Sequence, residues 1–331
     1  MYQFPVLTKT KCKPIITTLM HKTMKKIIGL TLITFISANM QAQVKDSTGI
    51  ARDTTDLMSK LEREASGNNK DSTYYARATF KTTRLINGHT VENVGKGVLD
   101  VKISHRFGHL NTGGYNLFGL DDASMRMGLD YGITNNLMVG IGRSTYQKAY
   151  DAFFKLKILR QSTGKKNMPI TLSYVPTIVL KTFPKPDPEK TNYFSSKLFF
   201  SHQLIIARKF STNTSLQLMP TFVHRNLAPL VSDPNNLLSI GIGGRQKISK
   251  RVSINVEYYY QLPGYKQDST TNCLSIGFDI ETGGHVFQLH FTNSRGMNEP
   301  TFITETTGKW GKGDISFGFN ISRVFNIGKK R

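Results

Sequence analysis

The chain has 331 residues, of which 38% are hydrophobic and 28 are glycine, and its formal net charge is +22. The hydrophobic share lies below the roughly 45–50% of typical globular proteins, counted with glycine, which argues against one large soluble core. The basic excess does not call for nucleic acid, because the chain carries an export signal, and anionic lipid headgroups account equally well for lysines that cluster in turns.

The first 42 residues carry that export signal. Met24-Lys25-Lys26 is a short positive region, and the apolar run from Ile27 to Ala38 follows it. The run is too short to span a membrane as a helix and predicts a cleavable signal peptide over 24–42. Residues 1–23 are interpreted as the product of a start codon placed too far upstream. Processing leaves 38 basic against 22 acidic residues, a net charge of +16, and one cysteine, Cys273, so no disulfide scaffold is expected.

Residues 43–94 are predicted to form a periplasmic tail or plug segment. The stretch 43–72 is polar and rich in Lys, Asp, Asn and Ser, which predicts a mostly disordered tail. Asn87-Gly88 predicts a turn in the more structured stretch that follows. We expect 73–94 either to remain in the periplasm or to fold into a barrel as a plug. A periplasmic protein bound through 43–94 is a candidate partner.

Residues 95–331 contain segments in which apolar and polar side chains alternate. In RVSINVEYYYQL, residues 251–262, Val256 and Tyr258 share one face while Asn255 and Glu257 share the other. Only an extended strand converts a period of two into two faces. Most segments have the length of a tilted strand that crosses hydrocarbon. The twelve segments lie near 97–107, 124–133, 136–146, 149–160, 168–181, 197–210, 214–225, 237–248, 251–262, 273–281, 285–293 and 313–325.

The connections between these segments alternate between long and short, with exceptions at Gln147-Lys148 and 161–167. Outer-membrane barrels place short turns in the periplasm and long loops outside. The predicted fold is therefore all-β: a single closed antiparallel transmembrane β-barrel of about 12 strands, exported to the bacterial outer membrane. A soluble sandwich or lipocalin-like barrel would explain the alternation but not the strand length or the loop asymmetry. Pro169, Pro176 and Pro220 predict bulges or rim positions, because proline donates no ladder hydrogen bond.

The stretches FKTTRLINGHTVENVGKGVLDVKISHRFG, FGLDDASMRMGLDYGITNNLMVGIGRS and YDAFFKLKILRQSTG, between Phe80 and Gly164, resemble a Bacteroidota family of predicted outer-membrane β-barrel proteins. The family is catalogued as a domain of unknown function. The resemblance extends over most of the mature chain and implies an outer-membrane barrel, without an activity, ligand or catalytic residue. The chain departs from many bacterial barrels at its C-terminus, where Phe325 is followed by NIGKKR.

No catalytic constellation stands out, and no enzyme activity, cofactor or metal is expected. His105 and His109 are spaced like ligands on a helix, but here one lies on a predicted strand and the other in a loop. His202 shares the apolar face of its segment and is the best candidate for an outer-membrane lipid hydrolase. Such an enzyme needs a serine on a neighbouring strand, and the sequence does not identify one.

The polar face of the segments predicts a charged lumen. Basic residues lie mostly on the first eight strands and acidic residues on the last four, so two opposed walls would create a transverse field. Alternatively, the charges pair across a narrow lumen and fill it. We expect passive, porin-like passage of small polar or anionic solutes; a closed structural or docking barrel is the alternative. The lumen-lining candidates are Lys102, Arg106, Arg126, Lys155, Lys157, Lys209, Arg245, Lys247, Glu257, Asp279, Glu281 and Asp314.

Overall fold

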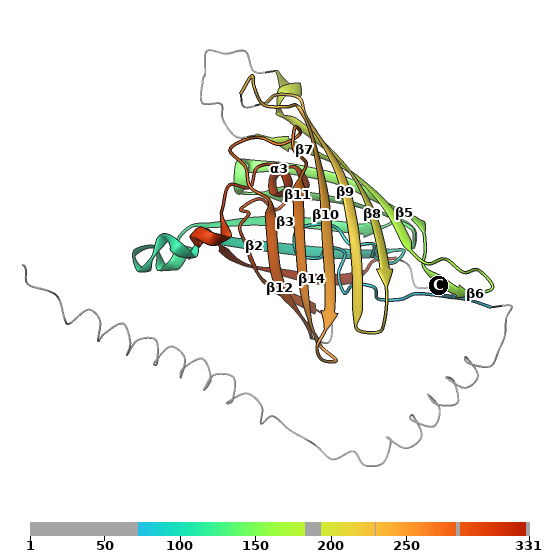
Figure 1. Ribbon diagram of the computed structural model, residues 1–331. Helices are drawn as coiled ribbons and strands as arrows, with labels where there is room; N and C mark the ends of the chain where they lie inside the picture. The colour runs from blue at the N-terminus through green and yellow to red at the C-terminus, as the bar shows by residue number, and fades with distance from the viewer. Residues whose placement is uncertain (1–71, 183–192, 229, 283–284, 329–331) are drawn as a thin grey trace, which may run out of the picture. The chain divides into compact units, whose positions relative to one another are not determined.

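The computed structural model describes residues 72–182, 193–228, 230–282 and 285–328 (Figure 1). The predicted upstream segment, the signal peptide and most of the predicted tail lie outside the described residues. The chain divides into two compact units, and the described residues all belong to the second, Asn69–Arg331. No helix in this part of the chain is long and apolar enough to cross a membrane.

The second unit is a closed antiparallel barrel of twelve strands, as the alternation predicts. Consecutive barrel strands pair with each other, and the last pairs with the first, for example through Phe319 opposite His105. The strands are β2 (Val98–His109), β3 (Ala123–Gly132), β4 (Leu137–Ser144), β5 (Ala149–Leu159), β7 (Thr171–Lys181), β8 (Leu198–Lys209), β9 (Thr214–Arg225), β10 (Asn236–Lys247), β11 (Val252–Gln261), β12 (Cys273–Thr282), β13 (His285–Thr292) and β14 (Ser316–Asn326).

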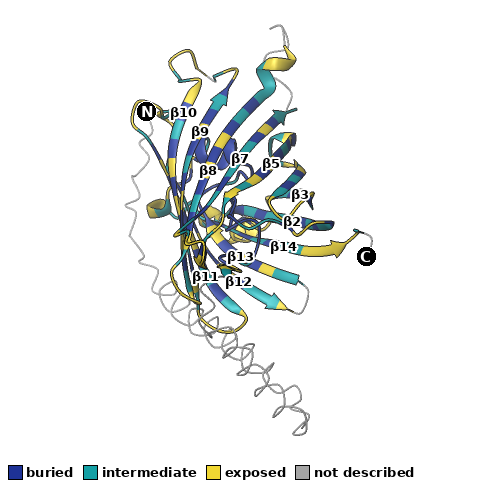
Figure 2. Ribbon diagram, turned by 90° about the vertical axis from the view of Figure 1, so that its right-hand side faces the viewer, coloured by how far each residue is buried: buried dark blue, intermediate teal, exposed yellow. Residues whose placement is uncertain are grey.

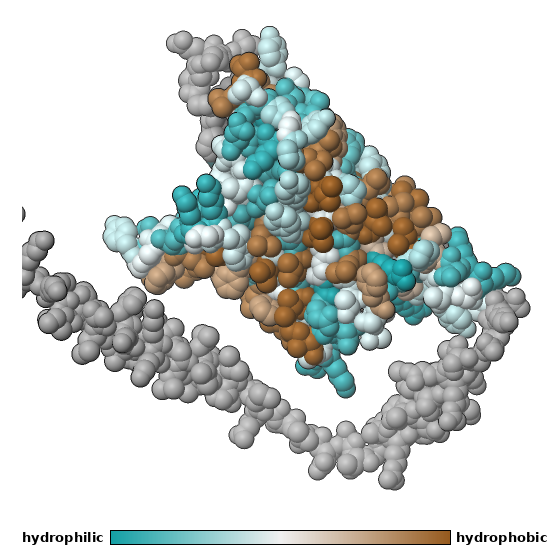
Figure 3. Space-filling view, in the orientation of Figure 1, coloured by the Kyte–Doolittle hydropathy of each residue, from teal (hydrophilic) through white to brown (hydrophobic). Residues whose placement is uncertain are grey.

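The alternation along each strand separates an exposed apolar face from a buried inner face (Figure 2). In β11, Val256, Tyr258 and Tyr260 are exposed, whereas Asn255 and Glu257 are buried. Figure 3 shows hydrophobic side chains gathered over the outside of the strands. An outward apolar band around a closed barrel is the arrangement that hydrocarbon stabilises, because no backbone edge remains unpaired.

The two ends of the barrel differ in the length of their connections. We call the end at which β2 begins and β14 ends the tail end, and the opposite end the loop end. The loop end carries η1 (Leu110–Thr112), η2 (Gly114–Gly119), η3 (Tyr146–Lys148), η4 (Phe194–Lys197), α3 (Glu299–Thr304) and η5 (Trp310–Lys312). Both exceptions to the loop pattern are real: η3 is a tight turn, and the tail-end connection after β5 contains β6 (Ser162–Gly164), which pairs with β1 (Thr73–Tyr75).

The prolines interrupt strand pairing more often than they shift its register. Opposite Pro176 the pairing of β5 with β7 passes from Phe153 directly to Leu156 without a change of register. The pairing of β8 with β9 likewise skips the neighbourhood of Pro220. Pro169 precedes β7, near the tail end. The expected bulges are thus replaced by gaps in the ladder at these two prolines, because the missing N–H removes a bond without adding a residue.

Gly132 is expected to tolerate no side chain. It lies at the tail end of β3, where the chain leading into β2 crosses it, and a Cβ there would lie 2.0 Å from the backbone oxygen of Gly95. Gly132→Ala should therefore lower the free energy of unfolding by about 1–3 kcal/mol. The control is Gly244→Ala, whose Cβ would lie 3.0 Å from a Leu216 methyl and 4.0 Å from the backbone oxygen of Ser215. Urea unfolding in lipid vesicles, followed by circular dichroism, compares them; equal midpoints would contradict the expectation.

Candidate functional site

A segment that precedes the first barrel strand occupies the lumen. Residues 79–94, which we call the plug, are almost all buried. The plug forms a short hairpin: Arg84 pairs with His89, and the amide of Leu85 donates to the carbonyl of Gly88 at 2.8 Å. The turn includes the Asn87-Gly88 pair that the sequence singles out. The chain then leaves the lumen near Gly97, whose amide donates to Gly132.

The ammonium group of Lys155 binds the backbone of the plug. Lys155 points inward from β5 and is fully buried. Its Nζ donates to the carbonyl oxygens of Thr83 at 3.0 Å, Thr90 at 2.9 Å and Glu92 at 2.7 Å. An ammonium group has three donors, so these carbonyls use its full capacity.

The carboxylate of Glu257 binds the plug at the turn of its hairpin. It points inward from β11 and is also fully buried. The amide of Asn87 donates to its Oε1 at 2.9 Å, while the amides of Ile86 and Gly88 donate to its Oε2 at 3.3 and 3.2 Å. The turn of the plug thus forms a small anion site for a side chain of the wall.

A second segment fills the lumen from the loop end. Residues 293–308, which we call the loop insert, contain α3, whose residues are all buried. Asn298 caps α3 by accepting from the amide of Thr301, and the helix lies against β8 and β11 (Figure 1). Arg106 connects both inserts, because it donates to the carbonyls of Ser294 and Gly296 and to the side chain of Asn87.

The plug and the loop insert meet at a buried ion pair. Arg84 of the plug donates to Glu299 of α3 at 2.7 Å, and the two side chains are 7% and 1% exposed. His89 Nε2 lies 3.3 Å from the same carboxylate oxygen. Arg84 and Glu299 lie 215 positions apart in the chain. Their ion pair therefore joins two segments that reach the lumen from opposite ends of the barrel.

Apolar side chains from the plug, the loop insert and the wall form one core inside the barrel. Phe302 of α3 packs edge to face on Tyr259, with 5.1 Å between ring centres. The lumen is therefore not lined by charges alone, because in this region three surfaces bury apolar groups against each other. The core contains Phe80, Leu85, Val91, Val94, Met138, Phe153, Val175, Ile205, Ala207, Met219, Tyr259, Cys273, Phe302 and Ile303.

The candidate lumen residues differ in burial and position. Asp314 precedes β14, outside the barrel wall, where the amide of Lys309 and the side chain of Asn111 donate to it. These hydrogen bonds, first that of Lys309, lower the pKa of Asp314. The inward and buried candidates are Lys102, Arg106, Arg126, Lys155, Arg245, Glu257 and Asp279; those of intermediate burial are Lys157, Lys209, Lys247 and Glu281.

The charges of the wall do not form two opposed surfaces. Arg126 forms an ion pair with Asp151 of a nearby strand, with its Nε 2.9 Å from Oδ1. Lys102 binds Asp130 at 2.6 Å. Arg245 donates to the carbonyl of Thr79 in the plug. The described structure thus favours the alternative in which lumen charges pair and fill the barrel, since carboxylates lie among the basic residues.

A cavity remains between the plug and the tail end. Its volume is ≈ 620 Å³, and it lies beside Thr83, Glu92 and Asp100. At its rim Lys81 of the plug forms an ion pair with Glu281 at 2.5 Å. The cavity is bounded by the plug on its inner side.

The histidines that the sequence singles out do not lie together. His105 faces outward and stacks on Phe319 with 5.0 Å between ring centres. Within the described residues no cluster of three His, Cys, Asp or Glu side chains is arranged to hold a metal ion. The Nδ1 of His202 lies 2.7 Å from the hydroxyl of Tyr174, and its ring stacks on Tyr174 and Phe222. The nearest polar partner of this histidine is thus a tyrosine rather than a serine.

Four residues of the site were not identified from the sequence: Arg84, His89, Asp151 and Glu299. Asp151 has a usable signal, because it alternates with Tyr150 and Ala152 and therefore points inward. The other three lie in segments without periodicity, where direction cannot be inferred from spacing.

A family model described as a membrane-bound β-barrel domain matches residues 80–325. The chain belongs to this family. The resemblance to a family of membrane β-barrels that was inferred from the sequence is thereby confirmed. The match begins at Phe80, so this family domain includes the plug as well as the barrel. No curated protein matches the chain.

Among solved structures, the NanC porin is 8% identical, with coverage of 68% of this chain and 98% of that chain and a TM-score of 0.44. The KdgM porin is also 8% identical, covers 69% and 99%, and has a TM-score of 0.42. An outer-membrane channel from Pseudomonas putida F1 is 12% identical, covers 71% and 98%, and has a TM-score of 0.45. Similarities at this level carry no information on what this barrel transports or binds.

Proposed function

We propose that the protein is a self-plugged outer-membrane barrel that passes small polar, preferentially anionic solutes only after the plug leaves the lumen. The proposal rests on the hydrogen-bond partners of the charged residues that point inward from the barrel wall. Lys155 and Glu257 bind the plug backbone rather than a permanent charged partner. Such contacts can be exchanged for water or solute when the plug is displaced, whereas wall pairs such as Arg126 with Asp151 would persist.

The preference for anions follows from the charges that displacement would expose. Lys155 and Arg245 contact plug carbonyls, so each would become a cation available to a solute. Glu257 would lose its plug partners as well, whereas Asp279 accepts a hydrogen bond from Gln288 of the wall and would remain paired. With long loops outside, the tail end of the barrel, where β2 begins and β14 ends, would face the periplasm.

Spontaneous opening is expected to be rare. Five apolar plug residues, Phe80, Leu85, Ile86, Val91 and Val94, are buried. At roughly 1.5–3 kcal/mol for each large apolar side chain, their exposure to water costs on the order of 10 kcal/mol. An unassisted open state would therefore be populated about once in 10⁷ molecules. The proposal thus needs an agent that displaces the plug, and the periplasmic tail is the natural point of attachment for it.

A closed barrel that docks a periplasmic protein through residues 43–94 is the second candidate. The continuous apolar core favours it, because a permanently filled lumen would look the same. An outer-membrane lipid hydrolase centred on His202 is a third and weaker proposal. A lipid-hydrolysis assay on the purified protein tests it, and measurable turnover lost in His202→Ala would support it.

Conductance in planar bilayers separates the first two candidates. The mature chain should conduct little, whereas deletion of residues 73–94 should produce stable channels whose permeability favours anions. Lys155→Met, which keeps the plug but removes three of its hydrogen bonds, should raise the frequency of brief openings. Deletion of 43–72 alone leaves the plug in place and serves as the matched control.

Heat-dependent migration in gels verifies that each variant forms a barrel. A folded variant without residues 73–94 that still does not conduct would exclude gating by the plug alone, because the loop insert would then close the lumen by itself, and would favour the closed docking barrel. If deletion of 73–94 prevents folding, the openings of Lys155→Met decide the question, and their absence would count against gating.

A further inference from the structure

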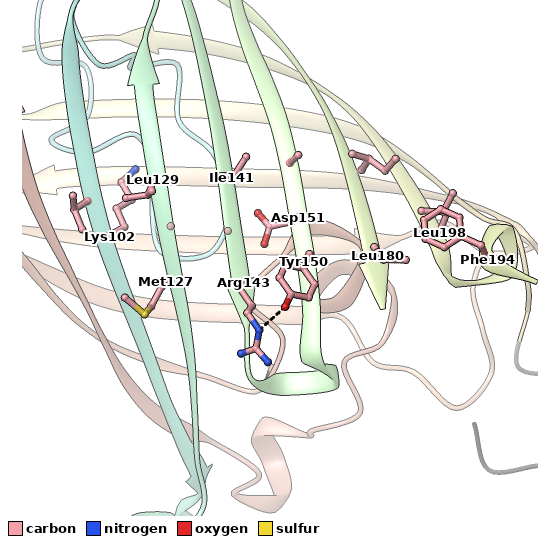
Figure 4. Close-up of a pocket in the computed structure, with 15 residues that line it drawn as sticks. Lys102, Met127, Leu129, Ile141, Arg143, Tyr150, Asp151, Leu180, Phe194 and Leu198 are labelled. Atoms are coloured by element: carbon pink, nitrogen blue, oxygen red, sulfur yellow. Dashed lines mark hydrogen bonds between the residues drawn. The ribbon is translucent and has the colours of Figure 1, made fainter. Parts of the chain in front are cut away.

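A groove lies on the outer face of the barrel, across β3, β4, β5 and β7 (Figure 4). Its volume is ≈ 660 Å³. Strand register places Leu129, Ile141, Ala152 and Ile178 side by side in one row across these strands. Ala152 has the smallest side chain of the row, so the surface is hollowed between the isoleucines that flank it.

The neighbouring row toward the loop end contains a cation. It runs through Met127, Arg143, Tyr150 and Leu180. Arg143 is exposed, its Nε donates to the hydroxyl of Tyr150 at 3.2 Å, and its guanidinium lies 5.4 Å from the centre of that ring (Figure 4). Tyr150 thus orients Arg143, while neither Nη atom has a hydrogen-bond partner among the described residues.

The position of Arg143 along its strand indicates what it meets. It lies one residue before the loop end of β4. A lipid-facing arginine is tolerated near the membrane interface and becomes costly toward the midplane. Among the described strands, the other outward guanidinium groups, Arg208 and Arg323, lie near the tail end. Arg143 is therefore placed at the depth of headgroups in the leaflet on the loop side.

We propose that this groove binds an anionic, phosphate-bearing lipid of the outer leaflet. One acyl chain would lie over Ala152 between Ile141 and Ile178, and a phosphate would bind the two free nitrogens of Arg143. Guanidinium groups bind phosphate oxygens in a bidentate manner, which suits this orientation. A second copy of the barrel fits less well, because no carboxylate projects from the outward faces of the described strands to meet Arg143.

Native mass spectrometry of the detergent-solubilised mature protein with added lipid A tests the site. The wild type should retain lipid A, and Arg143→Gln should weaken binding about tenfold or more through loss of charged hydrogen bonds. Ala152→Phe should weaken it similarly by filling the groove. The matched control is Arg323→Gln, which removes an outward arginine at the tail end and should leave binding unchanged.

Phosphatidylcholine and inorganic phosphate are the comparison probes. Retention of phosphatidylcholine as strong as that of lipid A, or equal displacement by inorganic phosphate, would overturn the proposal. Unchanged lipid A binding in Arg143→Gln would also overturn it. A change of oligomeric state in Ala152→Phe without loss of lipid would identify the groove as an interface between copies instead. Arg143→Gln alters no packing inside the barrel, so the test remains decisive if Ala152→Phe fails to fold.

Discussion

Replacement of Glu299 by alanine is expected to lower the free energy of unfolding by about 3–5 kcal/mol. The substitution leaves the guanidinium of Arg84 buried without its carboxylate, at a site where the two side chains are 7% and 1% exposed. The loss of a buried partner costs more than the pair contributes, because the remaining charge has been removed from water. Urea unfolding of the barrel in lipid vesicles measures the change.

The control is Asp122→Ala at the same end of the barrel. Asp122 also pairs with an arginine, Arg295, at 2.6 Å, but these side chains are 59% and 33% exposed. Its removal should cost less than about 1 kcal/mol because water screens the pair. A double-mutant cycle with Arg84→Ala isolates the coupling. Equal losses for Glu299→Ala and Asp122→Ala would contradict the view that the two inserts are joined by a buried charge.

Replacement of Glu257 by alanine is expected to release the turn of the plug. Three buried amide N–H groups, those of Ile86, Asn87 and Gly88, lose their acceptor. Each unsatisfied donor costs about 1–3 kcal/mol, so the plug should lose several kcal/mol of its attachment. Hydrogen–deuterium exchange at these three amides reports the loss directly. Glu257→Gln, which retains one acceptor oxygen, should increase the exchange rate of these amides less than Glu257→Ala does.

The matched control for this experiment is Asn255→Ala. Asn255 occupies the preceding inward position of β11 and is equally buried. The Asn255→Ala substitution should leave the exchange rates of the three plug amides unchanged. Slow exchange at Asn87 and Gly88 in a folded Glu257→Ala protein would show that the plug is held mainly by its apolar core.

The barrel was predictable because each strand has one face toward the outside of the barrel and the other toward its interior. Val256 and Tyr258 contact the outside while Asn255 and Glu257 turn inward, and only a period of two achieves this. Segment 214–225 was predicted with the bounds that β9 has, and the even strand number places the start of β2 and the end of β14 at the same end of the barrel. The direction of Lys155 and Glu257 could be predicted in the same way, since it depends on the neighbours in the strand.

The contacts that close the lumen could not be predicted in this way. Lys155 and Glu257 were expected to line an open passage, but both bind plug backbone. The plug and the loop insert have no repeating pattern, and their decisive contact joins Arg84 to Glu299 across 215 positions. Tyr259 lies on the inward face of β11 with Asn255 and Glu257, yet its ring packs on Phe302 of the loop insert. Such contacts depend on three-dimensional proximity, which local spacing does not encode.

The seam between β14 and β2 has a consequence for the order of folding. The plug lies on the N-terminal side of β2, and the loop insert, followed by η5, lies on the N-terminal side of β14. The first and last barrel strands, which pair with each other across the longest stretch of chain, are thus each preceded by a segment that fills the lumen. Because long-range pairing is slow, closure of the cylinder should wait until both contents have docked on the nascent sheet. The rate of seam formation is then governed by the interior segments as well as by the strands themselves.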